Sequence, residues 1–323
     1  MMTGLDIYNP ISGEMARVEE LLIESIDTEL TTLDQAATHL IRAGGKRLRP
    51  AFVLLAAKVF ADEVEKAIPL ATSLELVHMA SLVHDDVIDN SELRRGQPTV
   101  KNRWGNRISL YTGNYVLAKS LALAAGYRRS DILAVLADAS MRICEGEIKQ
   151  MRSCFNIHQG LKEYLRRIER KTALLIAVSC QLGAMLSDAA DHQVRALERY
   201  GYYLGMAFQV TDDILDFIAS EEVLGKPVGS DIRQGVITLP AIYALHYGQE
   251  RDKLGKMLAS PLACNRQAEE IISLICDSEG IDYAYYVSNK FAERARQQLN
   301  HLPDRPVKDT LYEIASYISA REY

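Results

Sequence analysis

The 323-residue sequence predicts an all-α protein with a single domain spanning 1–323. Apolar residues recur at three- and four-residue spacing, the period of a helix, and no segment alternates with the period of two that marks a strand. The nine prolines and 19 glycines fall mainly between such stretches. No linker rich in Gly or Ser divides the chain, so one domain is expected.

The helical stretches follow one another in order. The clearest lie at 18–43, 68–89, 108–125, 161–186 and 192–218. The last two are longer than the mean helix. The stretch at 161–186 is apolar around much of its circumference, which is typical of a helix at the centre of a bundle.

Composition and charge exclude several classes of protein. The net charge of −6 argues against a general nucleic-acid binder, and the apolar content of 48% argues against disorder. The longest apolar runs, such as 173–178, are shorter than the roughly 20 residues of a membrane span. Five scattered cysteines without a CxxC pair predict buried, reduced thiols, and residues 1–13 lack a secretory pattern. A cytoplasmic protein is therefore expected.

Two segments each contain the pattern DDxxD within an apolar helical stretch. Residues four apart project from one helix face, so Asp85 stacks on Asp89 and Asp212 on Asp216. Like charges at this spacing repel, so each cluster requires a cation. Ligation by carboxylates favours Mg²⁺, which commonly joins carboxylates to substrate phosphates. The predicted metal ligands are Asp85, Asp86, Asp89, Asp212, Asp213 and Asp216.

A single DDxxD segment is explained equally well by a solvated acidic helix face or by helix caps. Two copies of one pattern, each flanked by apolar residues, favour the metal site. A calcium-binding loop is disfavoured, because neither segment has alternating acidic ligands followed by Gly.

Basic residues that could clamp a metal-bound diphosphate lie in several segments. Each one taken alone is explained by a solvated charge, but together with the acidic motifs they indicate a diphosphate site built from several helices. The chain lacks GxxxxGK[ST], which excludes a P-loop nucleotide fold. The basic candidates lie in 44–50, at Arg94 and Arg95, at Arg166, Arg167, Arg170 and Lys171, and at Lys226.

Six motifs together carry a resemblance that extends over nearly the whole chain. They are GGKRLRP (44–50), ELVHMASLVHDDVID (75–89), RRG (94–96), KT (171–172), FQVTDDILD (208–216) and GKPVGSD (225–231). In their order and spacing the chain resembles the trans-isoprenyl diphosphate synthases. Within that family, RRIERKTALLIAVSCQLGA (166–184) and YISAREY (317–323) resemble the catalytic component II of bacterial heptaprenyl diphosphate synthases.

The resemblance implies an antiparallel helical bundle around a deep central cavity, with the two DDxxD motifs facing each other at its mouth. It implies Mg²⁺-dependent, successive head-to-tail condensation of isopentenyl diphosphate onto an allylic diphosphate, farnesyl diphosphate being the expected primer. The implied product is heptaprenyl diphosphate for the menaquinone side chain. Hexaprenyl, octaprenyl and solanesyl diphosphate are the alternatives.

The resemblance also implies roles for individual residues. The acidic motifs would hold the Mg²⁺ ions, three per site, on the allylic diphosphate, which Arg94, Lys171 and Lys226 would also bind. Thr172 and Gln209 would border the reacting carbons. The diphosphate of isopentenyl diphosphate would meet Lys46, Arg49, His78 and Arg95. The catalytic set implied is Asp85, Asp86, Asp89, Lys171, Thr172, Gln209 and Asp212.

The chemistry of the residues agrees with this implication. Cleavage of an allylic C–O bond leaves a carbocation and diphosphate, whose negative charge Mg²⁺, Arg and Lys stabilise. The isopentenyl double bond then attacks the cation, so no protein nucleophile is required. His84 lies about 100° around the helix from Asp85, which predicts a packed histidine and not a ligand. One departure is Val236, where many relatives place a second Lys.

Helix geometry also bears on product length. A hydrocarbon tail that leaves the first acidic motif should run back along the same helix past Ser81, Val77 and Leu74. Short-chain relatives place an aromatic floor four or five residues before the motif, where this chain has Ser81 and Ala80. The small residues predict a product longer than C20. Close helix packing without an open tunnel is the alternative.

Two rival functions and the expected partners complete the prediction. A class I terpene cyclase also uses DDxxD and Mg²⁺, but it does not require the isopentenyl clamp of Lys46, Arg49 and His78. A non-catalytic partner subunit would tend to lose the acidic motifs, which are intact here. The resemblance implies a dimer, either of two copies or with a small non-catalytic component I subunit. It also implies transient membrane contact during product release.

Overall fold

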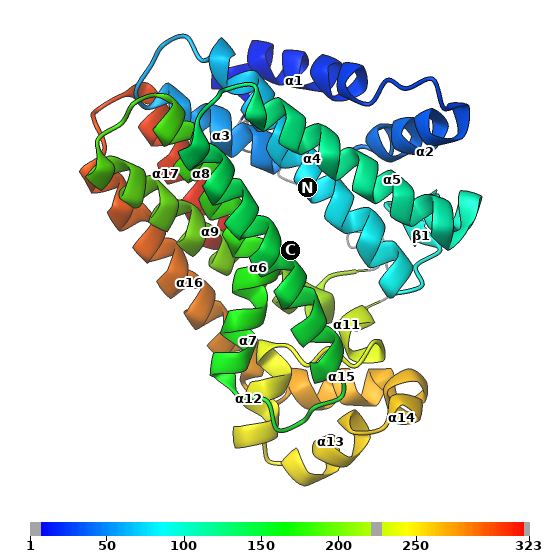
Figure 1. Cartoon of the computed structure of the whole chain (residues 1–323). Coiled ribbons are helices and arrows are strands. Elements are labelled where there is room, and N and C mark those ends of the chain that lie inside the picture. The colour runs from blue at the N-terminus through cyan, green and yellow to red at the C-terminus, as the bar shows by residue number, and fades with distance from the viewer. Residues whose placement is uncertain (1–7, 221–227, 320–323) are drawn as a thin grey trace.

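The structure is a computed structural model that describes residues 8–220 and 228–319 (Figure 1). Helices form almost all of its regular structure, which confirms the predicted all-α class. In the part of the chain that the structure describes, the strands are limited to the two-residue pair β1 (Leu93–Arg94) and β2 (Gln97–Pro98).

The N-terminal half supplies the helices on which the first acidic motif is built. In chain order they are η1 (Asn9–Ile11), α1 (Ser12–Ser25), α2 (Thr31–Arg42), α3 (Leu48–Lys58), η2 (Glu65–Ala67), α4 (Ile68–Ile88), α5 (Val100–Ala125) and α6 (Ser130–Ser153).

The C-terminal half begins with a long helical segment and the helix of the second acidic motif. These are α7 (Leu161–Ile168), the π-helical turn η3 (Glu169–Ala173), α8 (Leu174–Leu186) and α9 (Asp191–Ile218). Shorter helices below the long ones in Figure 1 are α11 (Ser230–Arg233), α12 (Leu239–Tyr247), α13 (Arg251–Leu258), α14 (Pro261–Arg266) and α15 (Ala268–Cys276). The chain then forms α16 (Gly280–Gln298), η4 (Leu299–His301) and α17 (Pro306–Ser319).

The structure divides two of the predicted stretches and extends a third. The stretch at 18–43 is two helices, because α1 ends at Ser25 and residues 26–30 form a non-helical connection to α2. The stretch at 161–186 is interrupted by η3, where the backbone adopts π-helical hydrogen bonding. The stretch at 108–125 is the end of a longer helix with a kink at Gly105, whose φ is 80°.

The helix α8 lies at the centre of the packing, as its apolar circumference predicts. It contacts α9, α3 and α6, and ten of its 13 residues are buried. The neighbouring α4 packs on α5 and α3. The two helices that end in acidic motifs, α4 and α9, are therefore anchored in the same core.

The segment Glu65–Ile88 has the length and composition of a membrane span, with a mean hydropathy of 1.2 over an 18-residue window. Uninterrupted apolar runs did not reveal this segment, because Glu75 and His78 interrupt its apolar residues. In the structure, 67% of that window is buried against other parts of the protein. Its apolar character is therefore accounted for by its place in the core.

All five cysteines are free thiols, as predicted, but they are not all buried. Cys180 and Cys264 are buried, whereas Cys144, Cys154 and Cys276 are exposed. Composition alone does not separate these two groups.

Candidate active site

The first acidic motif lies at the C-terminal end of α4, in agreement with the predicted helical stretch at 68–89. The helix ends at Ile88, and Asp89 is its C-cap, whose amide donates a 2.8 Å hydrogen bond to the carbonyl of Asp85. The predicted stacking of Asp85 and Asp89 is thus present. Carboxylates at a helix C-terminus also meet the negative end of the helix dipole, which adds to their mutual repulsion. This end of α4 therefore favours a bound cation.

Asp85 carries the electrostatic consequence of this crowding. Burial, followed by the charge of Glu147 and, more weakly, that of Asp89, raises its pKa to about 7, and the cations Lys171 and Arg94 oppose the rise. Burial also raises the pKa of Asp86, although its hydrogen bond from Arg94 opposes that change. Both carboxyls are easier to ionise when a cation binds beside them.

The second acidic motif occupies the last turns of α9, and Asp213 within it is almost fully buried. Tyr164 donates a 2.7 Å hydrogen bond to Oδ2 of Asp213, and Gln209 donates a 2.8 Å bond to Oδ1. Thr172 in turn donates to Oε1 of Gln209 at 2.6 Å. Both oxygens of Asp213 are thus engaged by protein donors, and the chain of bonds connects η3 to α9.

Asp216, in the last turn of α9, has a different surrounding. Its Oδ2 accepts a 3.0 Å hydrogen bond from the backbone amide of Asp231 at the start of α11. The charge of Asp231 also raises the pKa of Asp213, after burial, to about 7. Asp231, at the start of α11, is therefore a fourth acidic residue beside the three of the motif.

The turn before α3 places two of the predicted diphosphate-binding cations. Arg47 is buried in the left-handed region, with φ of 47°, and donates to Glu19 at 2.6 Å and to Glu75 at 3.2 Å. Because these carboxylates neutralise Arg47, the residue fixes the turn and leaves Lys46 and Arg49 on either side of it. Lys46 extends over the ring of Phe208, 5.9 Å from its centroid.

Arg49 and Arg95 form the cationic side of the site, and His78 lies near both. Burial lowers the pKa of Arg49, which the charges of Glu75 and Asp212 oppose. Burial and then the charges of Arg49 and Arg95 lower the pKa of His78 well below its usual range, so the imidazole is neutral at neutral pH. A neutral His78 can donate one hydrogen bond to a phosphate oxygen without adding charge.

The hairpin after α4 positions the two remaining arginines. Arg95 and Gly96 both have positive φ, at 54° and 75°, as a tight hairpin turn requires. Arg94 returns to the acidic motif and donates to Oδ1 of Asp86 through Nε at 2.9 Å and Nη2 at 2.8 Å. Arg95 lies against the 44–47 turn, since a Cβ on Gly45 would be 2.4 Å from its Nη1.

The π-helical turn η3 lies between the two acidic motifs. Lys171 acts on Asp85 by its charge and approaches Oε1 of Gln150 at 3.4 Å, whereas Thr172 bonds to Gln209 of α9. Single π-helical turns frequently occur at functional sites. Here the π-helical turn directs Lys171 to the first acidic motif and the neighbouring Thr172 to α9, so that both motifs belong to one site.

Sequence reasoning missed Glu147, on α6. Burial raises its pKa, Lys171 lowers it and Asp89 raises it, so this carboxylate lies beside the first motif. Gly146, its neighbour in the sequence, was the residue that could have pointed to it. A Cβ at Gly146 would be 2.7 Å from Cβ of Arg170. The glycine allows α6 to approach η3 closely. Tyr164 was also missed, since nothing in its local sequence points to Asp213.

The donor set fits Mg²⁺ bound together with a phosphorylated substrate. In residues 8–220 and 228–319, no three His, Cys, Asp or Glu side chains are grouped as a ready metal cage. Two groups of carboxylates instead flank cationic side chains that suit phosphate. Mg²⁺ typically takes one or two carboxylates and completes its shell with water and substrate phosphates. Such an ion would neutralise the surplus negative charge at the end of α4.

The residues proposed to line the tail path are buried along α4, except Ser81. Ser81 is partly exposed, Ala80 and Val77 are 2% and 4% exposed, and Leu74 is 0% exposed. A side chain without accessible surface does not border an open channel, so a tail that passes Leu74 must displace side chains. A product longer than C20, as the small residues Ala80 and Ser81 predict, therefore remains a prediction.

Three further positions were singled out from the sequence, namely His84, Val236 and Lys226. His84 packs against α5, because a Cβ on Gly113 would lie 2.4 Å from its Nε2, as expected for a packed histidine. Val236 follows α11 and its amide donates to the carbonyl of Asp231 at 2.8 Å. Lys226 lies outside the described residues.

Comparisons with known proteins agree with this arrangement. A family model described as polyprenyl synthetase matches residues 30–275. Heptaprenyl diphosphate synthase component 2 of Geobacillus stearothermophilus is 45% identical over 98% of each chain. The same component of Bacillus subtilis is 44% identical over 98% of this chain and 90% of its own.

Solved structures are similar over nearly the whole chain. Heptaprenyl diphosphate synthase from Staphylococcus aureus superimposes with a TM-score of 0.90 at 37% identity, over 96% of this chain and 98% of its own. A polyprenyl synthase from Caulobacter crescentus, complexed with calcium and isoprenyl diphosphate, has a TM-score of 0.90 at 31% identity, over 98% and 97%. With acidic motifs on two helix ends and this extent of similarity, the chain belongs to the polyprenyl synthetase family and is a prenyltransferase, a polyprenyl diphosphate synthase.

Proposed function

We propose that this chain is the catalytic component of a heptaprenyl diphosphate synthase that extends farnesyl diphosphate with isopentenyl diphosphate. The observation that carries the proposal is the 45% identity to a component 2 protein over 98% of both chains. The two intact acidic motifs, at the ends of α4 and α9, support a catalytic role over that of an accessory subunit.

The described residues suggest how the reaction is organised. Bound Mg²⁺, three ions in this proposal, would supply positive charge for the departing diphosphate. Asp85, Asp86 and Asp89 from α4 and Asp212 and Asp216 from α9 would hold those ions. Arg94 and Lys171 would contact the same diphosphate, and Lys226 completes that set in the proposal.

The isopentenyl diphosphate would bind on the opposite, cationic side of the site. Lys46, Arg49 and Arg95 would pair with its phosphates, and neutral His78 would donate a hydrogen bond. The carbonyl oxygen of the Gln209 amide and the hydroxyl of Thr172 lie at the junction of the motifs, where their dipoles can stabilise a carbocation. The proton lost after bond formation passes to the released diphosphate, so no protein base is needed.

Exposed apolar side chains on α5 and α6 support the assignment of a partner subunit. These two helices contact each other, and each carries three exposed large apolar side chains. Large apolar groups left in contact with water often mark interaction surfaces. We propose that the small component subunit, or a second copy of this chain, covers this apolar surface of α5 and α6. Its residues are Leu110, Tyr111, Leu121, Met141, Ile148 and Met151, which are 40–60% exposed.

The test is a reaction with labelled isopentenyl diphosphate, farnesyl diphosphate and Mg²⁺, resolved by product length, with and without a candidate small subunit. Heptaprenyl diphosphate formed only or mainly with the partner supports both parts of the proposal. A C40 or C45 product would contradict the heptaprenyl assignment. Diphosphate release without isopentenyl diphosphate would indicate a cyclase. The cytoplasmic location expected from the sequence remains part of the proposal.

Product length has its own test at Ala80. Replacing this nearly buried residue in Ala80→Phe places an aromatic ring beside the proposed tail path, one turn before Asp85. The average product should shorten to C20 or less while the first condensation continues. Ala190→Phe, an exposed alanine at the start of α9, is the matched control. An unchanged product distribution in Ala80→Phe would contradict the path along α4.

A further inference from the structure

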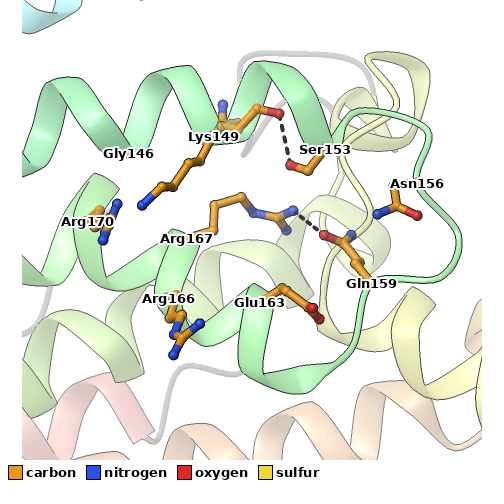
Figure 2. Close-up of a pocket in the computed structure, with 10 residues that line it drawn as sticks. Gly146, Lys149, Ser153, Asn156, Gln159, Glu163, Arg166, Arg167 and Arg170 are labelled. Carbon is orange, nitrogen blue, oxygen red and sulfur yellow. Dashed lines mark hydrogen bonds between the residues drawn. The ribbon is translucent and has the colours of Figure 1, made fainter.

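A second cationic pocket lies between α6 and α7, on the side of η3 that carries Arg170. It has a volume of about 560 Å³, within the range of small-ligand sites. The basic run 166–170, which the sequence places just before Lys171, accounts for most of its charge. Figure 2 shows Lys149 extending from α6 toward Arg167 and Arg170. Lys149, Arg166, Arg167 and Arg170 all line this pocket, and the charge of Arg167 also lowers the pKa of Asp213 in the second acidic motif, against the larger effect of burial.

The cations of this pocket are incompletely neutralised. Arg167 donates to Oε1 of Gln159 at 3.1 Å and to the carbonyl of Ile237 at 2.7 Å, and both acceptors are neutral. Within residues 8–220 and 228–319, Arg166 and Arg167 form no ion pair. Glu145 alone serves two cations, Arg170 at 3.4 Å and Lys149 at 3.9 Å.

The one carboxylate in the pocket wall is engaged elsewhere. Glu163 accepts a hydrogen bond of 2.5 Å from the backbone amide of Gly160 at the start of α7. Four basic side chains therefore outweigh the local acids, in a chain whose net charge is −6. Positive charge concentrated in a concave site attracts anions of matching size.

The polar wall of the pocket suits a phosphorylated ligand. The amides of Gln150, Asn156 and Gln159 and the hydroxyl of Ser153 can donate to oxygen atoms alongside the charged groups. Arginine is well suited to paired hydrogen bonds with phosphate oxygens. Three to four cations match the charge of a diphosphate better than that of a single carboxylate.

We propose that this pocket is a second diphosphate site, distinct from the metal-dependent one and independent of Mg²⁺. Its ligand class is a free diphosphate, as released at each condensation, or the head group of isopentenyl diphosphate. Gln150 connects the two sites, because it borders the pocket and also approaches Lys171 at 3.4 Å. Occupancy of the pocket would therefore be sensed at the active site.

The test uses hydrogen–deuterium exchange of the full chain in EDTA, with inorganic diphosphate as the probe. Because the readout is protection of peptides covering 149–167, it separates this pocket from the acidic motifs and does not depend on product length. Lys149→Glu should raise the Kd obtained from that protection at least tenfold, equal to about 1.4 kcal/mol. Lys162→Glu makes the same charge change on exposed α7, away from the pocket, and should leave that Kd unchanged.

Three outcomes decide the proposal. Protection of 149–167 that weakens only in Lys149→Glu supports it, and a second titration with isopentenyl diphosphate then shows which diphosphate binds more tightly. No protection in the wild-type chain overturns it, as does an equal Kd in the two variants. Inorganic phosphate that binds as tightly as diphosphate would overturn the assignment of ligand class. Both lysines are exposed, so neither variant should impair folding.

Discussion

The carboxylate of Asp213 illustrates how single residues organise this site. Its two oxygens accept hydrogen bonds from Tyr164 and Gln209, and Gln209 in turn accepts one from Thr172. A buried carboxylate held from both sides resists reorientation. It therefore acts as a positioning residue for Gln209 and Thr172, which the proposed mechanism places beside the reacting carbons.

Replacement of Tyr164 tests this arrangement. Tyr164→Phe removes one hydrogen bond to a buried carboxylate and should lower the free energy of unfolding by about 1.5–3 kcal/mol. Misalignment of Gln209 should lower kcat/KM by roughly tenfold. Urea unfolding and steady-state assays measure the two effects. Tyr286→Phe, at a ring that is 58% exposed, is the control; similar values for both variants would contradict the role of Tyr164.

The raised pKa of Asp85 predicts how the stability of the metal-free protein changes with pH. Its pKa in the folded chain is about 7, against an ordinary value of 3.8. Between these values the unfolded chain has released the proton that the folded chain retains, so the metal-free protein becomes less stable as pH rises. Mg²⁺ should reverse this trend, because it binds the ionised carboxylate.

Urea unfolding in EDTA at pH 5, 6 and 7 measures this dependence. Asp85→Asn should flatten the decline in unfolding free energy, and the remaining slope comes in part from Asp213, whose pKa is raised in the same direction. Asp131→Asn is the control, because its hydrogen bond from Arg129 lowers that pKa and moves its titration below this pH range. An unaltered slope in Asp85→Asn would refute the assignment.

At the scale of helices, the π-helical turn η3 and its neighbour α6 determine which side chains meet. Gly146 allows α6 to contact η3 closely, and this contact places Glu147 near Lys171 and the first acidic motif. The same turn directs Arg170 to the pocket between α6 and α7. One contact between two helices therefore borders both proposed diphosphate sites.

Gly146→Ala tests that contact. Its Cβ would lie 2.7 Å from Cβ of Arg170, so α6 and η3 must separate. The expected loss of stability is about 1–3 kcal/mol, with a lower kcat because Lys171 shifts with η3. Gly13→Ala on α1 meets nothing within 4 Å and should be neutral or slightly stabilising. Thermal unfolding of both variants, with assays, distinguishes close contact from simple helix propensity.

The helices show what local sequence can predict. Spacing of four placed Asp85 with Asp89 correctly, because helical geometry repeats locally. The predicted stretch at 68–89 agrees with α4 (Ile68–Ile88) to within one residue. Glu147 and Tyr164 were missed because they reach the acidic motifs through packing between distant segments. The division of Lys171 from Arg166, Arg167 and Arg170 depended on η3, which no residue pattern indicated.

At the scale of the whole molecule, α5 and α6 carry apolar side chains that the isolated chain leaves exposed. Six large apolar side chains on these helices are 40–60% exposed. Covering them would remove apolar area from water, which is the main driving force for stable association. This apolar surface thus fits a catalytic subunit that works with a partner.

Ile148→Glu tests this apolar surface, because it places a charge at a position that is 55% exposed in the isolated chain. We expect loss of the dimer, or of binding to the small subunit, without loss of helix content. Sedimentation velocity and circular dichroism measure the two properties. Leu262→Glu on α14, where the side chain is 60% exposed, is the matched control. Equal association of both variants would contradict the proposal that the interface includes α6.

The position of both acidic motifs at helix ends affects how ligand binding changes the resistance of the protein to unfolding. Ligands that engage Asp89 and Asp212 together would act as a removable cross-link between segments far apart in the chain. Such a link restricts the loops between them and raises resistance to unfolding by mass action. Each round of binding and release would then tighten and loosen the mouth of the bundle. Protease resistance should therefore rise when substrate and metal are present together.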